Sequence, residues 1–365
     1  MYASYVPNLR FPEFQGEWEK STLDKVCVFH NGRAYKQNEL LQSGKYRVLR
    51  VGNFFTNDSW YYSNLELEEE KMAVRGDLLY AWSASFGPRF WHEEKVIYHY
   101  HIWKVDSFQN VTKRYLYYYL EKDATKIKNE VQGGTMVHIT KGDMEKRAIT
   151  YPCVEEQKKI AKLLSLFDER IATQHKIIDK LQSLIQGIRV RLVQIEKGNI
   201  VHLNEIASIY QPQTISSTEL TEDGFLVYGA NGIIGKYKDY NHKTEQICIT
   251  CRGNTCGMVN YTKPMSWITG NAMVINTDEH LNVVCKRYLF HYLSAYNFNR
   301  IISGSGQPQI VRTPLEKLEI TLPSILEQEQ KAMLLDRIQA KIENCNRVLS
   351  LYQEQKQYLL RQMFI

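Results

Sequence analysis

The segment ITYPCVEEQKKIAKLLSLFDERI, at residues 149–171, returns as ITLPSILEQEQKAMLLDRIQAKI at residues 320–342. The two copies share a proline, a Glu-Gln pair and the apolar positions that follow. A proline near the first turn of a helix costs little, because its missing N–H would be unpaired there. We therefore expect a long helix to begin at each copy, and the chain to consist of two halves with one plan.

Two further segments repeat at nearly the same spacing. TKRYLYYYL at 112–120 matches CKRYLFHYL at 285–293, and GDLLYAWSASFG at 76–87 matches EQICITCRGNTCG at 245–257 more loosely. In the looser pair an alternating apolar run leads into a small polar turn, which is typical of a strand. The sequence predicts β-rich domains at residues 1–151 and 199–322, with one helix near each KRYL.

The predicted long helices, at 152–198 and 323–365, carry apolar residues at alternating steps of four and three. Only Gln174 interrupts the first series and only Lys356 the second, and the register of the two series is the same. A 3.5-residue period over about five heptads is what a left-handed coiled coil requires. The predicted seam comprises Leu164, Phe167, Ile171, Ile178, Leu181, Ile185 and Ile188, with Leu335, Ile338, Ile342, Leu349, Tyr352 and Leu359.

We expect these two helices to pair with each other as an antiparallel coiled coil. The fold class would then be α+β, with two β-rich domains joined by the two helices in a pseudo-twofold arrangement. At 1.5 Å per residue, positions 160–195 of the first helix span roughly 50 Å. The alternatives are that each helix packs on its own domain, or that both pair with helices of a partner.

Composition excludes several classes of protein. The 365 residues suffice for about two domains, contain no apolar run of 18 residues, and begin without the order of a signal peptide. Seven scattered cysteines indicate a reducing compartment, and we expect the cytoplasm. A net charge of +6 suits a polyanionic partner, but it equally suits an ordinary solvated surface.

The motifs of catalysis are missing. No P-loop and no dinucleotide fingerprint occurs. CITC at 248–251 lacks a second ligand pair for zinc, and YHYH at 98–101 places alternate histidines on one face of a predicted strand. Strand packing explains both more simply than a metal does. We expect no catalytic residue, no metal and no cofactor in this chain, which would not be an enzyme.

Recognition chemistry remains, and it lies in polar loops. Residues 31–54 carry five cations opposed within the stretch only by Glu39. Arginine and lysine contact phosphates and guanine, while asparagine and glutamine can pair with adenine. Solvated or structural turns are the alternative interpretation of every loop. The candidate DNA-binding residues are Arg33, Lys36, Lys45, Arg47, Arg50, Trp82, Ser83, Gln132, Thr135, His138, Lys141, Gln211, Gln213, Asn231, Arg252, Asn254, Gln307, Gln309 and Arg312.

The two halves agree in scaffold and differ in these loops. Duplicated catalysis would keep the same reactive residues in both halves, so the difference favours two modules that recognise two different targets. The opening VPNLRFPEFQGEW at 6–18, the P…EQ helix start at 152–157 and 323–328, and SGSGQPQI at 303–310 add a family resemblance. Over essentially its whole length the chain resembles the specificity (S) subunits of type I restriction–modification systems.

The resemblance implies that each β-rich domain is a target recognition domain for half of a bipartite target in double-stranded DNA. It implies that the coiled coil sets the unread spacer and docks two methyltransferase (M) subunits, which bind S-adenosylmethionine and methylate adenine N6. Restriction (R) subunits that use ATP and Mg would join them. Two alternatives stay open: the S subunit of a fused, type IIB-like system, and a protein–protein scaffold without salt-sensitive DNA affinity.

Overall fold

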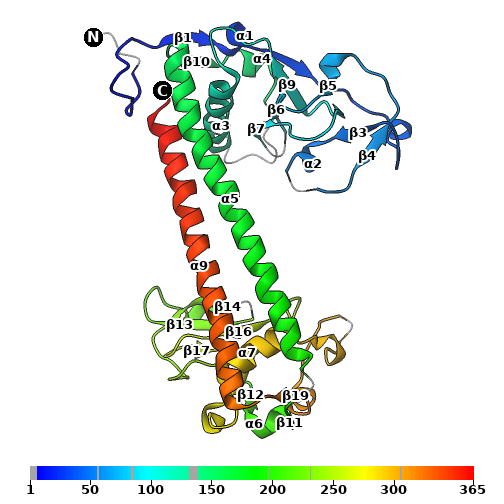
Figure 1. The fold of residues 1–365 in the computed structure, drawn as a ribbon, viewed down its shortest axis with the longest axis vertical. Helices are drawn as coiled ribbons and strands as arrows, with labels where there is room; N and C mark the ends of the chain where they lie inside the picture. Colours follow the sequence, from blue (N-terminus) through cyan, green and yellow to red (C-terminus); the bar gives the residue numbers. More distant parts are fainter. Residues whose placement is uncertain are drawn as a thin grey trace. The chain divides into compact units, whose positions relative to one another are not determined.

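The structure, a computed structural model, describes residues 6–55, 57–83, 86–130, 139–195, 197–230, 232–304 and 306–365. They form two compact units: unit 1 is Met1–Thr173 with Leu349–Ile365, and unit 2 is Gln174–Val348. The boundaries fall within the two long helices, α5 (Val154–Val193) and α9 (Ile325–Gln362). Each unit therefore contains part of both helices beside its own strands (Figure 1).

Unit 1 contains two small sheets and a strand pair. The first sheet has the order β2 (Val28–Asn31), β9 (Ile102–Asp106), β6 (Leu78–Ala81), β7 (Gly87–Phe90). The second has the order β4 (Tyr61–Ser63), β3 (Tyr46–Leu49), β8 (Val96–Tyr98), β5 (Met72–Ala73), and β1 (Glu19–Thr22) pairs with β10 (Ala148–Tyr151). The other helices are α1 (Leu23–Val26), α2 (Val51–Phe55), α3 (Lys113–Glu130) and α4 (Lys141–Glu145), with 3₁₀ turns η1 (Gln37–Glu39) and η2 (Glu69–Lys71).

Unit 2 follows the same scheme. Its first sheet has the order β12 (Ser208–Tyr210), β18 (Ala272–Asn276), β15 (Ile247–Thr250), β16 (Val259–Tyr261). Its second has the order β14 (Gly232–Tyr237), β13 (Phe225–Gly229), β17 (Trp267–Ile268), and β11 (Asn199–His202) pairs with β19 (Glu319–Leu322). The other helices are α6 (Leu203–Ile206), α7 (Lys286–Ala295) and α8 (Arg312–Glu316), with η3 (Ser217–Glu219), η4 (Asp278–His280) and η5 (Phe298–Arg300).

The strand pairing of the two units corresponds in direction as well as in order. In both first sheets every pair is antiparallel, and in both second sheets one parallel pair, β3 with β8 or β13 with β17, lies beside an antiparallel one. Among the described residues, β5 is a strand of unit 1 for which unit 2 has no counterpart. The internal repeat of the sequence is therefore a repeat of topology.

Each KRYL motif lies in a helix that fills the core of its unit. Tyr115 and Leu116 of α3 are fully buried, as are Tyr288 and Leu289 of α7. The Tyr115 hydroxyl donates to the Thr150 carbonyl of β10 at 2.9 Å, which satisfies its polar end inside the core. Tyrosine rings thus fill space in both cores, and in unit 1 the hydroxyls of Tyr115 and Tyr119 also bond to carbonyls of β10.

The two long helices pack against each other within each unit. Unit 1 combines the first half of α5 with the last turns of α9, and unit 2 combines the second half of α5 with the earlier part of α9, so the helices run in opposite directions. All thirteen seam residues predicted from the sequence are buried or partly buried. In unit 1 the rings of Phe167 and Tyr352 meet edge to face, with centroids 6.4 Å apart.

The two polar seam positions each have a partner. In unit 1 the Lys356 amine donates to Glu121 at 2.7 Å and lies 2.6 Å from the Asp168 carboxylate. In unit 2 the Gln174 side chain donates to the Cys345 carbonyl at 3.1 Å. A polar group inside an apolar seam is stable only when it is paired, so such positions help to fix the register of the helices.

The glutamine of the repeated Glu-Gln pair has a structural role at the start of each long helix. Gln157 of α5 is fully buried; its Oε1 accepts from the Thr112 amide at 2.7 Å, and its Nε2 donates to the Asn110 and Pro152 carbonyls at 2.8 and 2.9 Å. The side chain therefore joins the strand-to-helix turn at Pro152, which precedes α5, to the segment that begins α3.

Gln328 of α9 makes the same three bonds in unit 2. It accepts from the Cys285 amide at 2.9 Å and donates to the Val283 and Pro323 carbonyls at 3.1 and 2.9 Å. The adjacent glutamates differ, because Glu156 forms a two-bond ion pair with Arg10, whereas Glu327 accepts from Ser324. The glutamine is thus the half of the motif with the same role in both units.

We predict that Gln157→Ala accelerates amide hydrogen exchange at the start of α3, and that Gln328→Ala does so at the start of α7. Each substitution leaves one N–H and two carbonyls without a partner, and a buried unsatisfied group costs about 1–3 kcal/mol. Exchange measured by mass spectrometry checks both. Gln182, exposed on α5, provides the control Gln182→Ala. Equal exchange at both helices in all three variants would contradict the junction role.

Candidate nucleic-acid interface

Most cations of the basic stretch at residues 31–54 have acidic partners. Arg33 makes a two-bond ion pair with Glu39, at 2.8 and 3.0 Å, and lowers the pKa of that carboxyl. Lys45 pairs with Glu66, and Arg47 pairs with Glu93 at 2.7 Å. Glu66 and Glu93 lie outside the stretch, so the sequence overstated its free positive charge.

Arg50 and Lys36 form no ion pair with any of the residues that the structure describes. Arg50 is exposed, and its guanidinium carbon lies 5.1 Å from the centroid of the Tyr61 ring. The exposed Lys36 precedes η1, and its backbone amide donates to Glu39 at 2.8 Å. Of the five cations, these two remain available for phosphate contacts.

Trp82 follows β6 directly and packs on an aromatic stack. Its ring lies nearly parallel to that of Trp103, with centroids 5.7 Å apart, and Trp103 in turn lies 5.9 Å from Tyr80. The Trp82 amide donates to the His101 carbonyl at 3.2 Å and the indole N–H to the Tyr100 carbonyl at 2.8 Å. Ser83 is buried. Trp82 therefore supports the residues that precede β9.

Those residues are His99, Tyr100 and His101. The sequence predicts that the two histidines share one face of a strand, and this prediction is wrong. Strand β8 ends at Tyr98, and the Ile102 amide donates to the His99 carbonyl at 2.9 Å, which closes a tight turn. The rings crowd together, with centroids 4.9 Å apart for His99 and His101 and 3.9 Å for Tyr100 and His101. Alternation alone does not distinguish a strand from a turn that follows it.

The surroundings of His99 keep its imidazole neutral. Burial, followed by the proximity of His101 and Arg50, lowers the pKa of His99 from 6.5 to about 4. A neutral imidazole offers one hydrogen-bond donor and one acceptor. Within the described ranges no group of three or more His, Cys, Asp or Glu side chains could hold a metal ion, so these histidines do not form part of such a cluster.

In unit 2 several of the predicted residues lie together at the end of β15. Arg252 forms a bridge with Gln309, and the Gly253 amide donates to the Pro308 carbonyl at 3.0 Å. Ser303 and Gln309 bond to each other through their backbones. The loop that contains Gln307 is therefore attached to the loop that contains Arg252 and Asn254. The side chains of Arg252, Asn254, Gln307 and Gln309 are all exposed.

The other candidates lie elsewhere or outside the described residues. Gln211 donates to the Gly270 carbonyl at 3.1 Å, so it borders the same end of the first sheet as Arg252, and Gln213 is exposed two residues further on. Arg312 and Lys141 form ion pairs with Glu316 and Glu145 along α8 and α4. Gln132, Thr135, His138 and Asn231 lie outside the described residues.

At the end of β6 in unit 1 and of β15 in unit 2, the first sheet of each unit has a rim formed by the end of that strand and the adjacent turn. The backbone hydrogen bonds of the two rims correspond. The Trp82 amide bonds to the His101 carbonyl, and the Cys251 amide bonds in the same way to the Asn271 carbonyl at 3.1 Å. The turn before β9 is closed by Ile102 and His99, and the turn before β18 by Ala272 and Thr269 at 3.0 Å. Equivalent backbone positions therefore carry His-Tyr-His in unit 1 and Thr-Gly-Asn in unit 2.

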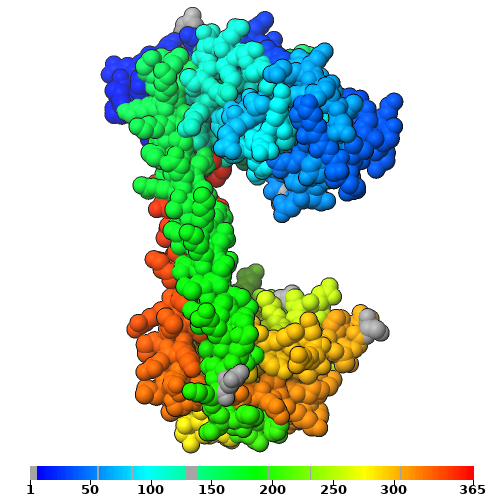
Figure 2. Space-filling model, turned by 45° about the vertical axis from the view of Figure 1, so that its right-hand side comes forward, coloured from blue at the N-terminus to red at the C-terminus, as the bar shows by residue number. Residues whose placement is uncertain are grey.

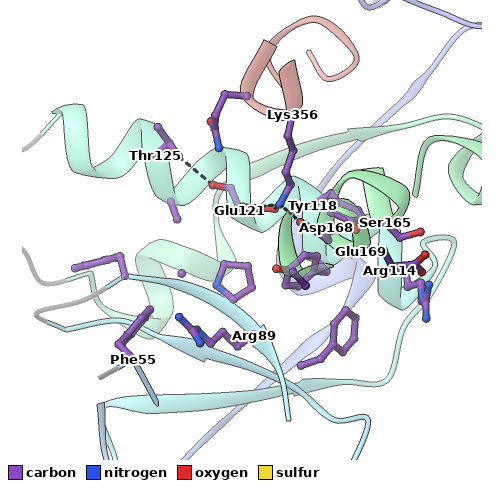
Figure 3. A pocket seen from close by; sticks show the side chains of 18 of the residues that line it. Phe55, Arg89, Arg114, Tyr118, Glu121, Thr125, Ser165, Asp168, Glu169 and Lys356 are labelled. Atoms are coloured by element: carbon purple, nitrogen blue, oxygen red, sulfur yellow. Dashed lines mark hydrogen bonds and ion pairs between the residues drawn. The ribbon is translucent and has the colours of Figure 1, made fainter. Parts of the chain in front are cut away.

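Each unit also has a groove beside its long helices. In unit 1 a groove of about 710 Å³ is lined by β7, α3, α5 and Lys356 of α9, and Figure 3 shows Arg89, Glu121, Asp168 and Lys356 around it. In unit 2 a groove of about 730 Å³ is lined by β16, α7, Arg189 of α5 and Gln339 of α9. The same elements form both grooves, which are therefore repeated features.

Arg189 and Arg287, which line the unit 2 groove, belong to a partly buried polar network. Arg189 Nε donates to His291 Nδ1 at 3.1 Å, and His291 Nε2 donates to Asp336 at 2.9 Å. Burial opposes ionisation of Asp336, but hydrogen bonds from His291 and Arg287 lower its pKa to about 2. The network joins α5, α7 and α9.

Among the described residues no helix is long and apolar enough to cross a membrane.

Comparison with known proteins agrees with the duplicated plan. Residues 15–183 and 196–350 each match the family described as Type I restriction modification DNA specificity domain. The chain is 32% identical over 146 residues to the EcoprrI specificity subunit of Escherichia coli, across 39% of this chain and 36% of that protein. It is 24% identical over 385 residues to the MjaVIII specificity subunit of Methanocaldococcus jannaschii, across 92% and 88%.

The matches with the E. coli protein and with a putative Haemophilus influenzae specificity subunit each span 36% of the relative's length. Among solved structures, the S subunit of M. genitalium has a TM-score of 0.69 at 18% identity, with 99% of both chains covered. A second structure, from work on assembly and conformational transition of the type I R-M system, has a TM-score of 0.56 at 15% identity. These structures share the fold.

The family match covers most of the chain, occurs once in each half, and coincides with two units of the same topology. The chain therefore belongs to the family of type I restriction–modification specificity subunits.

Proposed function

We propose that this chain is the DNA-reading subunit of a type I restriction–modification complex, and that its two units read the two halves of a bipartite target in double-stranded DNA. The residues 1–151 and 199–322 would be the target recognition domains. The observation that carries the proposal is the contrast between shared strand registers and different side chains at the equivalent turns. A frame used twice with two sets of polar groups suits two different base sequences.

The helices at 152–198 and 323–365 would form the coiled coil that sets the length of the unread spacer. Two observations support this role: α5 spans 40 residues, about 60 Å at 1.5 Å per residue, and the polar seam positions Gln174 of α5 and Lys356 of α9 are paired. A helix resists bending far better than a loop, so the half-target spacing would follow from helix length, as dimer geometry sets half-site spacing elsewhere.

The same helices would dock two methyltransferase (M) subunits, which methylate adenine N6 with S-adenosylmethionine, and the complex would recruit R subunits that use ATP and Mg. Exposed apolar side chains on both helices support a docking role, among them Leu184 at 50%, Leu351 at 57% and Met333 at 54% exposure. Figure 2 shows side chains of α5, in green, at the surface. Catalysis would belong to these partners, and the complex would act in the cytoplasm.

We predict that Arg50→Ala lowers DNA affinity and its dependence on salt. Each phosphate contact that is lost reduces the slope of log K against log salt by about 1. Titrations of the complex at several salt concentrations measure this slope. The control is Lys25→Ala, which removes an exposed cation on α1 outside the interface. Equal slopes for Arg50→Ala and the unmodified complex would contradict a phosphate contact at Arg50.

We predict that removing one heptad from each long helix, residues 174–180 with 345–351, shortens the spacer by about three base pairs. Seven residues correspond to about 10 Å of helix, and B-DNA rises 3.4 Å per base pair. The paired deletion removes Gln174 and its partner Cys345 together, so the seam register is kept. Methylation sequencing reports the spacer. An active complex with an unchanged spacer would contradict the ruler, and deletion from one helix alone should prevent assembly.

A further inference from the structure

The turn His99–His101 of unit 1 is held by backbone hydrogen bonds and close packing. The Arg33 amide donates to the Tyr98 carbonyl and the Tyr100 amide to the Arg33 carbonyl, both at 3.1 Å. The backbone of Gly32 approaches so closely that a Cβ there would collide with the His99 carbonyl oxygen. Trp82 holds the turn from the other side. A turn fixed by two loops presents its side chains in one arrangement.

The side chains of this turn are open to a ligand on their outer side. Tyr100 is 39% exposed, and His99 and His101 are partly exposed. Beneath them lies the stack of Trp82, Trp103 and Tyr80, of which the last two are buried. A tyrosine hydroxyl and a neutral imidazole can donate and accept hydrogen bonds at base edges, and aromatic carbons can contact the methyl group of thymine. This combination suits a base edge better than a phosphate.

A cation stands directly beside the turn. The His99 amide donates to the Leu49 carbonyl at 2.9 Å, which places the following residue, Arg50, next to it in the fold. Arg50 is exposed and forms no ion pair among the described residues. Nucleic-acid interfaces combine such a cation, for the backbone, with neutral polar and aromatic groups for the bases.

The equivalent turn of unit 2 has a different surface, and the structure explains why. Gly270 stands where unit 1 has Tyr100, and a Cβ at Gly270 would collide with Thr214 Oγ1 and lie 3.0 Å from the Pro212 carbonyl oxygen. The loop after β12 therefore covers this position in unit 2. The turn thus carries an exposed ring in unit 1, whereas in unit 2 the equivalent position is covered by the Thr214 hydroxyl and the Pro212 carbonyl.

We propose that the turn His99–His101 reads base edges in the half-target bound by unit 1, and that Tyr100 is a specificity-determining residue whose hydroxyl bonds to one base. The proposal rests on the proposed DNA-reading function and adds to it the reading element. It also assigns a different chemistry to unit 2, in which Asn271 and the loops of Gln211 and Arg252 would read.

The experiment uses the complex of the full chain with its methyltransferase partner. Tyr100→Ala should lower affinity for the cognate target about 5- to 150-fold, the range that corresponds to loss of the contacts to one base pair. Tyr100→Phe keeps the ring and should lose about 2- to 10-fold of the discrimination at one base pair, which corresponds to one neutral hydrogen bond. Affinities are measured on DNA with every base pair of each half-target substituted in turn.

Two controls separate recognition from folding. Asn271→Ala, at the equivalent turn, should change discrimination only in the other half-target. Tyr240→Ala removes a tyrosine of similar exposure, 36%, outside either turn and should change neither half. If thermal unfolding shows that Tyr100→Ala is not folded, the discrimination measured with the more conservative Tyr100→Phe tests the proposal.

The outcomes distinguish the proposal from the function on which it rests. Unchanged discrimination in both Tyr100 variants, with a bipartite target still read, would overturn the proposal and leave the DNA-reading function intact. Equal loss on every DNA sequence would assign Tyr100 to the phosphate backbone and also overturn it. A complex without any sequence preference would overturn both, and binding of a protein instead of DNA at this turn would do the same.

Discussion

The buried glutamine at the start of each long helix is the interaction on which each unit depends. Gln157 and Gln328 each bond to one amide and two carbonyls, and these groups belong to the turn after a proline and to the segment before a core helix. A buried polar side chain with all these partners is stable only in one arrangement, since any shift leaves groups unsatisfied in the interior. The glutamine therefore ties the recognition part of each unit to its long helix.

This constraint separates what is constant in the molecule from what varies. The sheets, the core helices α3 and α7 and the helix junctions follow one plan in both units, whereas the turns at the ends of the first sheets share their backbone bonds and differ in their side chains. Loops on a rigid frame can change their side chains without loss of the core. In unit 1 the rim carries aromatic rings and histidines, and in unit 2 it carries Arg252, Asn254 and glutamines. Under the proposed function, such a protein could change its DNA target without any change in the helices that would bind its partners.

Much of the frame could be predicted from the sequence, because periodicity and repetition report backbone structure. The long helices, the seam positions and the helices at both KRYL motifs follow from spacing alone. The interface could be predicted less well. Whether Arg47 is free depends on Glu93, and whether YHYH forms a strand face depends on the hydrogen bond that closes the turn at His99. Both are tertiary contacts without a local signal in the sequence. The same holds for Gly32, since the need for a glycine there follows from the closeness of the His99 carbonyl oxygen in the fold.

The most direct test of the whole account is the methylation pattern that this chain imposes on DNA. Cells that contain the chain and its methyltransferase partner, and no other adenine methyltransferase, would be analysed by sequencing that detects N6-methyladenine. The account predicts one bipartite motif, with two different specified halves and a spacer of constant length, that is absent when the chain is removed. A single contiguous motif, or methylation without sequence preference while the partner is active, would contradict it.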